Sequence, residues 1–400
     1  MLVSAAAYRA ARGPSRARGG PSGYIRMTSA LRASLRNRMD FDLSEDQMAL
    51  RDGARELLDG LSPPEAVRIV VEAGGGQSDA IWAAMVEQGW LGVALAEERG
   101  GLGFGTVELA VLLEEIGRHA TPVPFASTVL AIDVLDAADR TADVDRLVAG
   151  EAVGAVAWSS RADAVRATEA GGAWVLDGRA DPTLAAPSAS VVIVVAAAPD
   201  GPGLFLVDLD AVGRPAAEPA IDRTRELAWL DFAATPAERL GGADAVEALL
   251  DRGAVFACAE MLGGAGKVLE MTVEYAKDRV QFGRPIGSFQ ALKHRCADML
   301  VDVEGMRSTV YWAAWCIGAG DPEASIAAST TKVWTADASK RVMASGLQVH
   351  GGIGFTWEHD LHLFLKRAQL DQMTFGDAAY HRVRLAALLR PRVAAGTGVI

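Results

Sequence analysis

The stretch YAKDRVQFGRPIGSFQALKH at residues 275–294 decides how the C-terminal part of the chain folds. Its first residues continue a helical pattern through Arg279. Pro285 excludes helix at the residue before it, so the FGRP segment must be a turn. A second helix begins within 288–294. We therefore expect two helices joined by an exposed turn, with Arg279 ending the first and Gln290 near the start of the second.

Arg279 has two interpretations at this point. A guanidinium fork beside the backbone N–H groups of a helix start suits a phosphate or a pyrophosphate. The same side chain could instead stabilise the C-terminal end of its own helix through the helix dipole. The spacing alone leaves both open.

A second informative stretch, GLQVHGGIGFTWEHDLHLFLKRAQ, covers residues 346–369. Gly351 and Gly352, followed by Gly354, end a helix and allow a ligand or another chain to approach the backbone closely. A helix cap without a ligand is the alternative. The stretch also contains His350, His359 and His362. They do not form an H-x3-H pattern with a suitable carboxylate, so we predict no metal site.

The pattern outside these stretches divides the chain into regions. Residues 39–152 show helical spacing, with Ser44 and Gln47 as a capping box. Residues 153–241 contain short apolar runs separated by Gly, Pro and Asp, which predict an antiparallel β domain. Helical spacing returns over 242–400. The predicted long helices there are 243–278, 286–319, 322–349 and 377–389.

Residues 1–38 contain eight arginines and no acidic residue. This composition is superficially that of an organellar transit peptide, and an over-extended translation start with Met39 as the natural first residue is the alternative. We favour the second, because the Gly and Pro residues around Pro14 and Pro21 would break an amphipathic helix. Either origin predicts a disordered extension outside the fold.

Composition excludes several classes of protein. Half of the 400 residues are hydrophobic and 22% are charged, which rules out a mostly disordered chain. No apolar run approaches the roughly 18–20 residues needed to span a bilayer. The net charge is −12, and without residues 1–38 the remaining 31 basic and 51 acidic residues give −20. An acidic body argues against nucleic acid as a partner.

The cysteines are few and isolated. Cys258, Cys296 and Cys316 are odd in number and never form a CxxC motif, so neither a disulfide framework nor a zinc site is indicated. We expect a protein of a reducing, cytoplasmic compartment.

Taken together, the two motif stretches resemble the acyl-CoA dehydrogenase family of flavoproteins, and the resemblance covers residues 40–390. It includes IWAAMVEQGWLGVALAEERGGLGFG at 81–105 and LLEEIGRHATPVPF at 112–125. RVQFGRPIGSFQALKH and QVHGGIGFTWEHDLHL are its most specific parts. The resemblance implies an α+β multidomain fold: an N-terminal helical domain, a middle antiparallel β domain and a C-terminal four-helix bundle, assembled as a dimer of dimers with FAD between subunits.

The resemblance also implies a reaction, the α,β-dehydrogenation of an acyl-CoA thioester. In that chemistry a carboxylate removes the α proton and the β hydrogen leaves as hydride to the flavin. The family base is a Glu in a Tyr-Glu-Gly-Thr segment, and here Phe375 occupies that position. A minority of members carry the Glu on an earlier helix, which corresponds to Gly253, and Ala254 replaces the arginine that often follows. Phenylalanine and glycine cannot accept a proton, so we assign no catalytic residue.

Three acidic residues near the same helix, Glu247, Asp251 and Glu260, are candidates for a relocated base, and we expect each to face solvent. The segments that hold the flavin ring in the family are also altered. AWSSRADAV at 157–165 stands at the place of the Thr-Glu-Pro loop, and GRADPTLAAPSAS at 178–190 lacks the Trp-Ile-Thr segment. We interpret ATEAGG at 167–172 as a hairpin turn.

By contrast, the resemblance retains the residues that reach across to a neighbour's FAD pyrophosphate and adenosine. These are Arg279, Phe282, Gln290, Gln348, Gly351 and Gly352. We therefore expect a degenerate subunit of an α2β2 heteromer, similar to those of actinobacterial steroid side-chain degradation. A homologous partner would supply the base and the substrate cleft, and an electron-transfer flavoprotein is a candidate electron acceptor. A self-sufficient homomer with a relocated base and a FAD-free scaffold are the alternatives.

Overall fold

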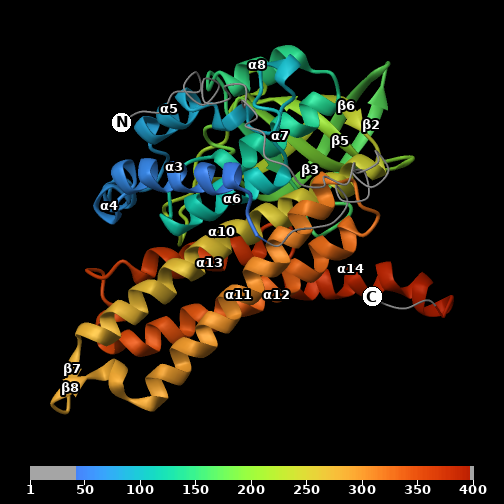
Figure 1. The fold of residues 1–400 in the computed structure, drawn as a ribbon. Coiled ribbons are helices and arrows are strands. Elements are labelled where there is room, and N and C mark those ends of the chain that lie inside the picture. Colours follow the sequence, from blue (N-terminus) through green and yellow to red (C-terminus); the bar gives the residue numbers. More distant parts are fainter. Residues whose placement is uncertain (1–41, 397–400) are drawn as a thin grey trace, which may run out of the picture.

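The computed structural model describes residues 42–396, so the expectations for residues 1–38 and for Met39 lie outside the described residues. Within the described range the chain forms a helical region, then a β region, then a second helical region, as the sequence predicts (Figure 1). None of the helices within 42–396 combines the length and the apolar character that a bilayer crossing requires.

The first helical region starts at the predicted capping box. The Gln47 backbone N–H donates to Ser44 Oγ over 3.2 Å, and the Ser44 N–H donates to Gln47 Oε1 over 2.9 Å. The helices of this region are α3 (Glu45–Leu61), α4 (Pro64–Glu72), α5 (Asp79–Glu87), α6 (Thr106–Arg118), α7 (Phe125–Ala137) and α8 (Thr141–Val148).

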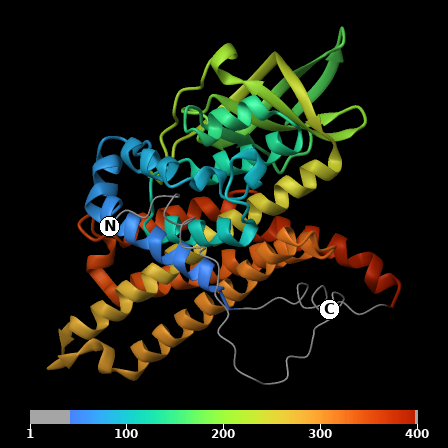
Figure 2. The same cartoon turned by 45° about the horizontal axis from the view of Figure 1, so that its top comes forward.

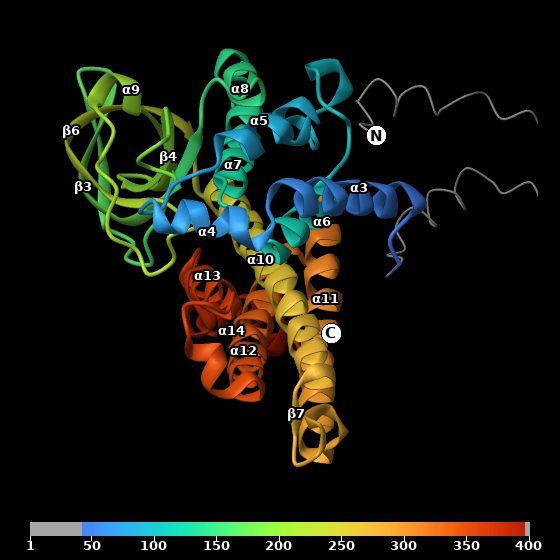
Figure 3. The ribbon, with the colours of Figure 1, turned by 90° about the vertical axis from the view of Figure 1, so that its left-hand side faces the viewer.

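The β region is one sheet of six strands. They are β1 (Gly154–Ala157), β2 (Val165–Ala170), β3 (Ala173–Leu184), β4 (Val191–Ala198), β5 (Gly201–Asp208) and β6 (Leu227–Gly241). Their order is β1-β4-β2-β3-β6-β5, and an additional β4–β5 pairing closes the sheet on itself (Figure 3). The short helix α9 (Leu209–Val212) follows β5.

One sequence expectation for this region is wrong in part. The sheet is mixed and not antiparallel, because β1 pairs parallel with β4, with Gly154 opposite Val191. After β1 the chain forms the β2–β3 hairpin. The next strand, β4, then lies beside β1 and runs in the same direction. The interpretation of residues 167–172 as a hairpin turn is confirmed: Gly171 and Gly172 have φ of +64° and +84°, as the tight turn between β2 and β3 requires.

The second helical region contains five helices: α10 (Ala243–Asp278), α11 (Gln290–Gly318), α12 (Ala324–His350), α13 (Leu361–Met373) and α14 (Ala378–Ala394). The predicted helix over 243–278 has the observed bounds. The separate helix α13 was not predicted. Two short strands, β7 (Val280–Gln281) and β8 (Arg284–Pro285), form the turn between α10 and α11, at the end of the bundle remote from the sheet (Figures 1 and 2). We propose region boundaries near 153 and 241.

Helices α6 and α10 cross with almost no space between their backbones. A Cβ atom built on Gly263 of α10 would lie 1.8 Å from the Glu114 carbonyl oxygen, and one on Gly117 of α6 would lie 2.0 Å from the Glu260 carbonyl oxygen. Two glycines therefore permit this crossing, which ties the first helical region to the bundle.

We predict that Gly263→Ala lowers the free energy of unfolding by about 3 kcal/mol or more, because the new methyl group meets backbone that cannot move aside cheaply. Gly266→Ala, three residues further along α10, is the matched control. A Cβ there meets nothing within 4 Å, so the substitution should stabilise the helix by about 0.5–1 kcal/mol. Chemical denaturation of both variants checks this, and equal effects would contradict it.

Candidate functional site

A cavity of about 840 Å³ lies where the three regions meet. Helix α7 supplies part of its wall, the β region supplies Val156 and Trp158, and the bundle supplies residues of α10, α13 and the start of α14. It is the place at which the family resemblance puts the flavin ring and the acyl group. The residues that line it therefore decide which chemistry this chain retains.

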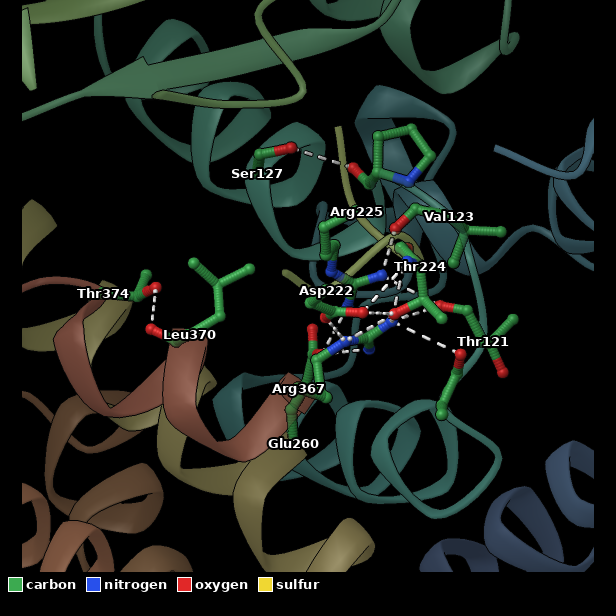
Figure 4. Close-up of polar contacts among 12 residues, drawn as sticks. Thr121, Val123, Ser127, Asp222, Thr224, Arg225, Glu260, Arg367, Leu370 and Thr374 are labelled. Atoms are coloured by element: carbon green, nitrogen blue, oxygen red, sulfur yellow. Dashed lines mark hydrogen bonds and ion pairs between the residues drawn. The ribbon is translucent and has the colours of Figure 1, made fainter. Parts of the chain in front are cut away.

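The inner wall of the cavity carries a buried charge cluster (Figure 4). Glu260 of α10 accepts hydrogen bonds from Arg225, which precedes β6, and from Arg367 of α13, whose Nη1 is 3.1 Å from Glu260 Oε2. Arg367 Nε also lies 2.9 Å from Asp222 Oδ2. The Glu260, Arg225, Arg367 and Asp222 side chains are all less than 10% exposed.

The same two arginines bind backbone of the first helical region. Arg225 Nη1 donates to the carbonyl oxygens of Thr121 and Val123 over 2.8 and 2.9 Å, and Arg367 Nη2 donates to that of Thr121 over 3.3 Å. Thr121 and Val123 lie between α6 and α7, Arg225 leads into the sheet and Arg367 belongs to the bundle. The charge cluster therefore joins all three regions.

The expectation that the candidate acids face solvent is wrong for two of them. Glu260 is 3% exposed and Asp251 is 5% exposed. Each is buried because an arginine compensates its charge: Glu260 as described, and Asp251 through Arg384, with a further hydrogen bond of 2.6 Å from Ser325. Glu247 is exposed, as expected. A carboxylate held by an arginine in this way is a poor general base.

We predict that Glu260→Gln lowers the free energy of unfolding by about 3–5 kcal/mol, because it leaves two buried guanidinium groups without their shared counter-charge. Glu274→Gln is the control. Glu274 pairs with Lys277, both side chains are more than 60% exposed, and such surface pairs contribute about 0–1 kcal/mol. Thermal or urea unfolding of the two variants measures the difference, and a Glu260→Gln cost as small as the control would refute the joining role of the cluster.

The two positions at which family members carry the base face each other in space. A Cβ built on Gly253 would lie 2.7 Å from the Phe375 ring, so the ring occupies the space into which a side chain at 253 would extend. Trp158 packs nearby, with its ring centroid 6.4 Å from that of Phe375 and 5.3 Å from that of Tyr380. An aromatic cluster of Trp158, Phe375 and Tyr380 thus fills the place of the base.

The loop that carries Phe375 is fixed by a buried histidine. His381 Nε2 lies 2.8 Å from the Phe375 carbonyl oxygen, and burial lowers the pKa of His381 to about 4. The imidazole is therefore neutral at pH 7 and donates this hydrogen bond in one tautomer. Lys332, which is fully buried, supports the same segment by donating to the Asp371 and Thr374 carbonyl oxygens over 2.6 and 2.8 Å.

We predict that Gly253→Ala destabilises the protein by about 1–3 kcal/mol through its clash with the Phe375 ring. Phe375→Ala also destabilises, by loss of packing, but the double variant should lose less than the sum of the two single variants. A double-mutant cycle by urea denaturation measures this coupling. Additive effects would show that the two positions do not share one space.

The segment at the place of the family's flavin-ring segment does not fit a flavin ring. Pro182 has no backbone N–H, and the Thr183 hydroxyl already donates to the Asp181 carbonyl oxygen over 3.0 Å. Leu184 brings no hydroxyl group. The wall of this chain's own cavity thus provides few free donors for the polar edge of a flavin.

The six residues assigned to a neighbour's cofactor lie elsewhere, at the end of α10, in the β7–β8 turn, at the start of α11 and at the end of α12. The β7–β8 turn is at the end of the bundle remote from the sheet (Figure 3). Arg279 is the C-terminal cap residue of α10, as expected, and Gln290 is the first residue of α11. The guanidinium of Arg279 is exposed and enters none of the ion pairs formed among residues 42–396. Phe282 stands in the turn with φ of +52° and is 91% exposed.

The second part of this set, at the end of α12, lies beside the last turns of α10. Tyr275 stacks on His350 with a centroid distance of 4.6 Å, which connects the two segments. Gln348 is exposed. Gly351 has φ of +62° and ψ of −138°, a conformation that glycine favours, and a Cβ on Gly351 or Gly352 would meet open space. Exposed backbone and an unpaired cation suit a diphosphate brought by another subunit.

The histidines of this segment are explained by packing. Beside the Tyr275 stack, His350 contacts His359 edge to face, and His362 stacks on Trp357 at 4.5 Å. Burial lowers the pKa of all three. Among the residues that the structure describes, no cluster of His, Cys, Asp and Glu has the arrangement of a metal site.

The functional residues that the sequence analysis missed are the buried ones. Arg225, Arg367, Lys332 and Asp371 line or support the cavity, yet no local pattern sets them apart from surface residues. Their hydrogen-bond partners are 35 to 247 residues away in the chain. The one sequence signal for the burial of Arg367 is its place on the apolar face of a helix. That helix, α13, is not among the predicted helices.

Comparisons with known proteins agree with the resemblance. Residues 44–138 match the family profile "Acyl-CoA dehydrogenase, N-terminal domain", and residues 241–389 match "Acyl-CoA dehydrogenase, C-terminal domain". The chain is similar to the acyl-CoA dehydrogenase IpdE2 of Mycolicibacterium smegmatis, with 34% identity over 86% of this chain and 99% of that protein. It is 30% identical to the acyl-CoA dehydrogenase FadE27 of Mycobacterium tuberculosis, over 85% of this chain and 96% of that one.

Solved structures give the same picture. A variant of the Tcur3481-Tcur3483 steroid ACAD superposes with a TM-score of 0.81 at 31% identity, over 88% of this chain and 99% of that one. The ChsE4-ChsE5 complex of Mycobacterium tuberculosis superposes with a TM-score of 0.81 at 28% identity and the same coverage.

Proposed function

Because this chain belongs to the acyl-CoA dehydrogenase family, we propose that it is the non-catalytic subunit of a heteromeric acyl-CoA dehydrogenase. In this proposal it completes the FAD site of a homologous partner and contributes no base of its own. FAD is the cofactor of the family, and it supplies the acceptor for the hydride that leaves the β carbon of an acyl-CoA.

The observation that carries the proposal is the separation of two sets of residues. The cavity has an aromatic side chain at each place where a base would need room, and Pro182 and Leu184 where a flavin ring would need donors. The surface around Arg279 and Gly351, at the far end of the bundle, is exposed and keeps its charge and open backbone. A subunit that completes a partner's FAD site needs this surface, and it needs neither a base nor flavin-ring donors in its own cavity.

Each retained residue has a distinct task in this arrangement. The Arg279 guanidinium pairs with the diphosphate of FAD, since it has five donors in a fixed fork and no partner among the ion pairs of the described residues. Gln290 and Gln348 offer amide groups for the adenosine portion. Gly351 and Gly352 let the backbone approach the cofactor. The exposed ring of Phe282 contacts the partner or the adenosine.

The class of partner follows from the groups that this chain lacks. A homologous subunit must bring a carboxylate base, a ring-binding segment and a substrate cleft, and an α2β2 assembly would hold two such sites. The relatives above include a steroid ACAD and the ChsE4-ChsE5 complex. We therefore propose a bulky, steroid-derived acyl-CoA as the substrate of the complex, a cytoplasmic location, and an electron-transfer flavoprotein as the electron acceptor.

We predict that Arg279→Ala removes FAD from the complex. The chain is co-expressed with a homologous partner that carries an intact base, and flavin absorbance is measured per heteromer after gel filtration. Loss of charged hydrogen bonds of about 1.5–3 kcal/mol should weaken FAD binding roughly 10- to 150-fold. Arg166→Ala, at a 68% exposed side chain of β2, is the control and should leave the flavin content unchanged.

The alternatives give different results in the same experiments. A self-sufficient homomer predicts stoichiometric FAD and acyl-CoA turnover in the chain expressed alone, which would overturn the proposal. A FAD-free scaffold predicts that the complex keeps its full flavin content after Arg279→Ala.

A further inference from the structure

Arg68 of helix α4 reaches across to the segment that follows Gly351 and Gly352. Its Nε donates to Asp360 Oδ1 over 2.6 Å, and its Nη1 donates to the Trp357 carbonyl oxygen, also over 2.6 Å. These partners are 292 and 289 residues away in the chain. One guanidinium group thus joins the first helical region to the segment between α12 and α13.

Asp360 uses its carboxylate for this contact and not for its own helix. It is the N-cap residue of α13, a place that aspartate favours because its carboxylate can accept from N–H groups of the first turn. Here the side chain makes no such hydrogen bond. The Arg68 and Asp360 side chains are 17% and 27% exposed, so solvent screens their attraction only in part. The ion pair thus takes the place of a helix cap.

The segment between its two ends is short and internally bonded. The helical turn η4 (Gly351–Phe355) packs back on the end of α12, since a Cβ on Gly354 would lie 3.0 Å from the His350 Cβ. The Thr356 N–H and hydroxyl both donate to the Ile353 carbonyl oxygen over 3.0 Å. Little slack is therefore left between the contact with α4 and the first residue of η4.

A column of three rings holds the segment from the other side. His359 contacts His350 edge to face with a centroid distance of 4.6 Å, and His350 stacks on Tyr275 at the same distance. Tyr275 lies four residues before Arg279, at the end of α10. The column therefore links Asp360, the residue after His359, to the helix end that carries the guanidinium of the proposed FAD surface.

We propose that Arg68 is a positioning residue for FAD at the partner's site. By holding the far end of the segment, it fixes the Gly351–Gly352 backbone relative to Arg279, so that both can contact the same cofactor. Arg68 acts through the segment and not by touching FAD. The inference rests on the proposed function, and it adds that helix α4 of the first helical region shapes the FAD surface.

The test measures the FAD affinity of the heteromer, in which the chain is co-expressed with a homologous partner that carries an intact base. FAD is removed and titrated back, and the change in its fluorescence gives the Kd. Arg68→Ala should weaken FAD binding about three- to tenfold. Asp360→Ala should weaken it to a similar extent, and the double variant should bind no worse than either single variant, because all three lose the same contact.

The Asp360 variant separates positioning from an effect of charge alone. Arg68→Ala removes a positive charge, and Asp360→Ala removes a negative one. If Arg68 acted only by attracting the diphosphate, the two substitutions would change FAD affinity in opposite directions. Opposite changes therefore overturn the inference, and similar losses support it.

Arg118→Ala is the matched control for structural damage. Arg118 of α6 donates to both carboxylate oxygens of Glu270 on α10 over 2.6 Å, and its side chain is 16% exposed, close to the value for Arg68. The control should lower the Tm about as much as Arg68→Ala does, but leave FAD affinity unchanged. An equal loss of FAD affinity in the control would overturn the inference. If Arg68→Ala does not assemble, Arg68→Lys replaces it, and should show a smaller loss because one ammonium group cannot hold both acceptors.

Hydrogen exchange in the full-length chain alone tests the structural step without FAD. Amides of residues 351–360 should exchange faster in Arg68→Ala than in the unchanged protein or in Arg118→Ala, and unchanged exchange would overturn the inference. In the heteromer, a loss of FAD affinity in Arg279→Ala but not in folded Arg68→Ala overturns it and leaves the proposed function standing. No loss in Arg279→Ala overturns the proposed function, and this inference with it.

Discussion

The fold depends on one carboxylate shared by two buried arginines. Glu260 reaches Arg225 and Arg367, and these two guanidinium groups in turn bind the backbone around Thr121. Taking such ions out of water costs several kcal/mol each, and only near-complete pairing offsets that cost. The cluster therefore forms only when all three regions are in place. The cluster joins the segment after α6 to α10 and α13, beside the close crossing of α6 and α10.

The charge cluster includes neither position 253 nor position 375, so the scaffold does not depend on the residues at the two positions of the family base. Gly253 and Phe375 have replaced the two alternative base positions with one packed contact, and the cavity wall around them is still ordered by Lys332 and His381. The residues of the charge cluster and the residues at the two positions of the family base are thus different sets.

Local signals in the sequence were sufficient for some of this and insufficient for the rest. Ser44 with Gln47, and Pro285 after Arg279, define helix ends through contacts within a few residues, so their predictions are confirmed. The parallel β1–β4 pairing joins segments 37 residues apart, from Gly154 to Val191, and no local pattern specifies it. Burial of Glu260 depends on Arg225 and Arg367, which lie 35 and 107 residues away in the chain. No local pattern shows these partners, so an acid on a helix was expected to face solvent.

The surface at the far end of the bundle has features that disfavour an isolated chain in free energy. Phe282 combines a left-handed backbone with a ring that is 91% exposed, and Phe355, near Gly351, is 75% exposed. Burying such a ring in an assembly would contribute about 1.5–3 kcal/mol, and a non-glycine residue at positive φ carries a cost of its own. A sequence that keeps both features at a tip remote from its own cavity is explained if another subunit covers that tip. In the proposed heteromer, the exposed tip and the aromatic ring at the position of the base have one explanation: this chain contributes a surface, and its partner contributes the cleft.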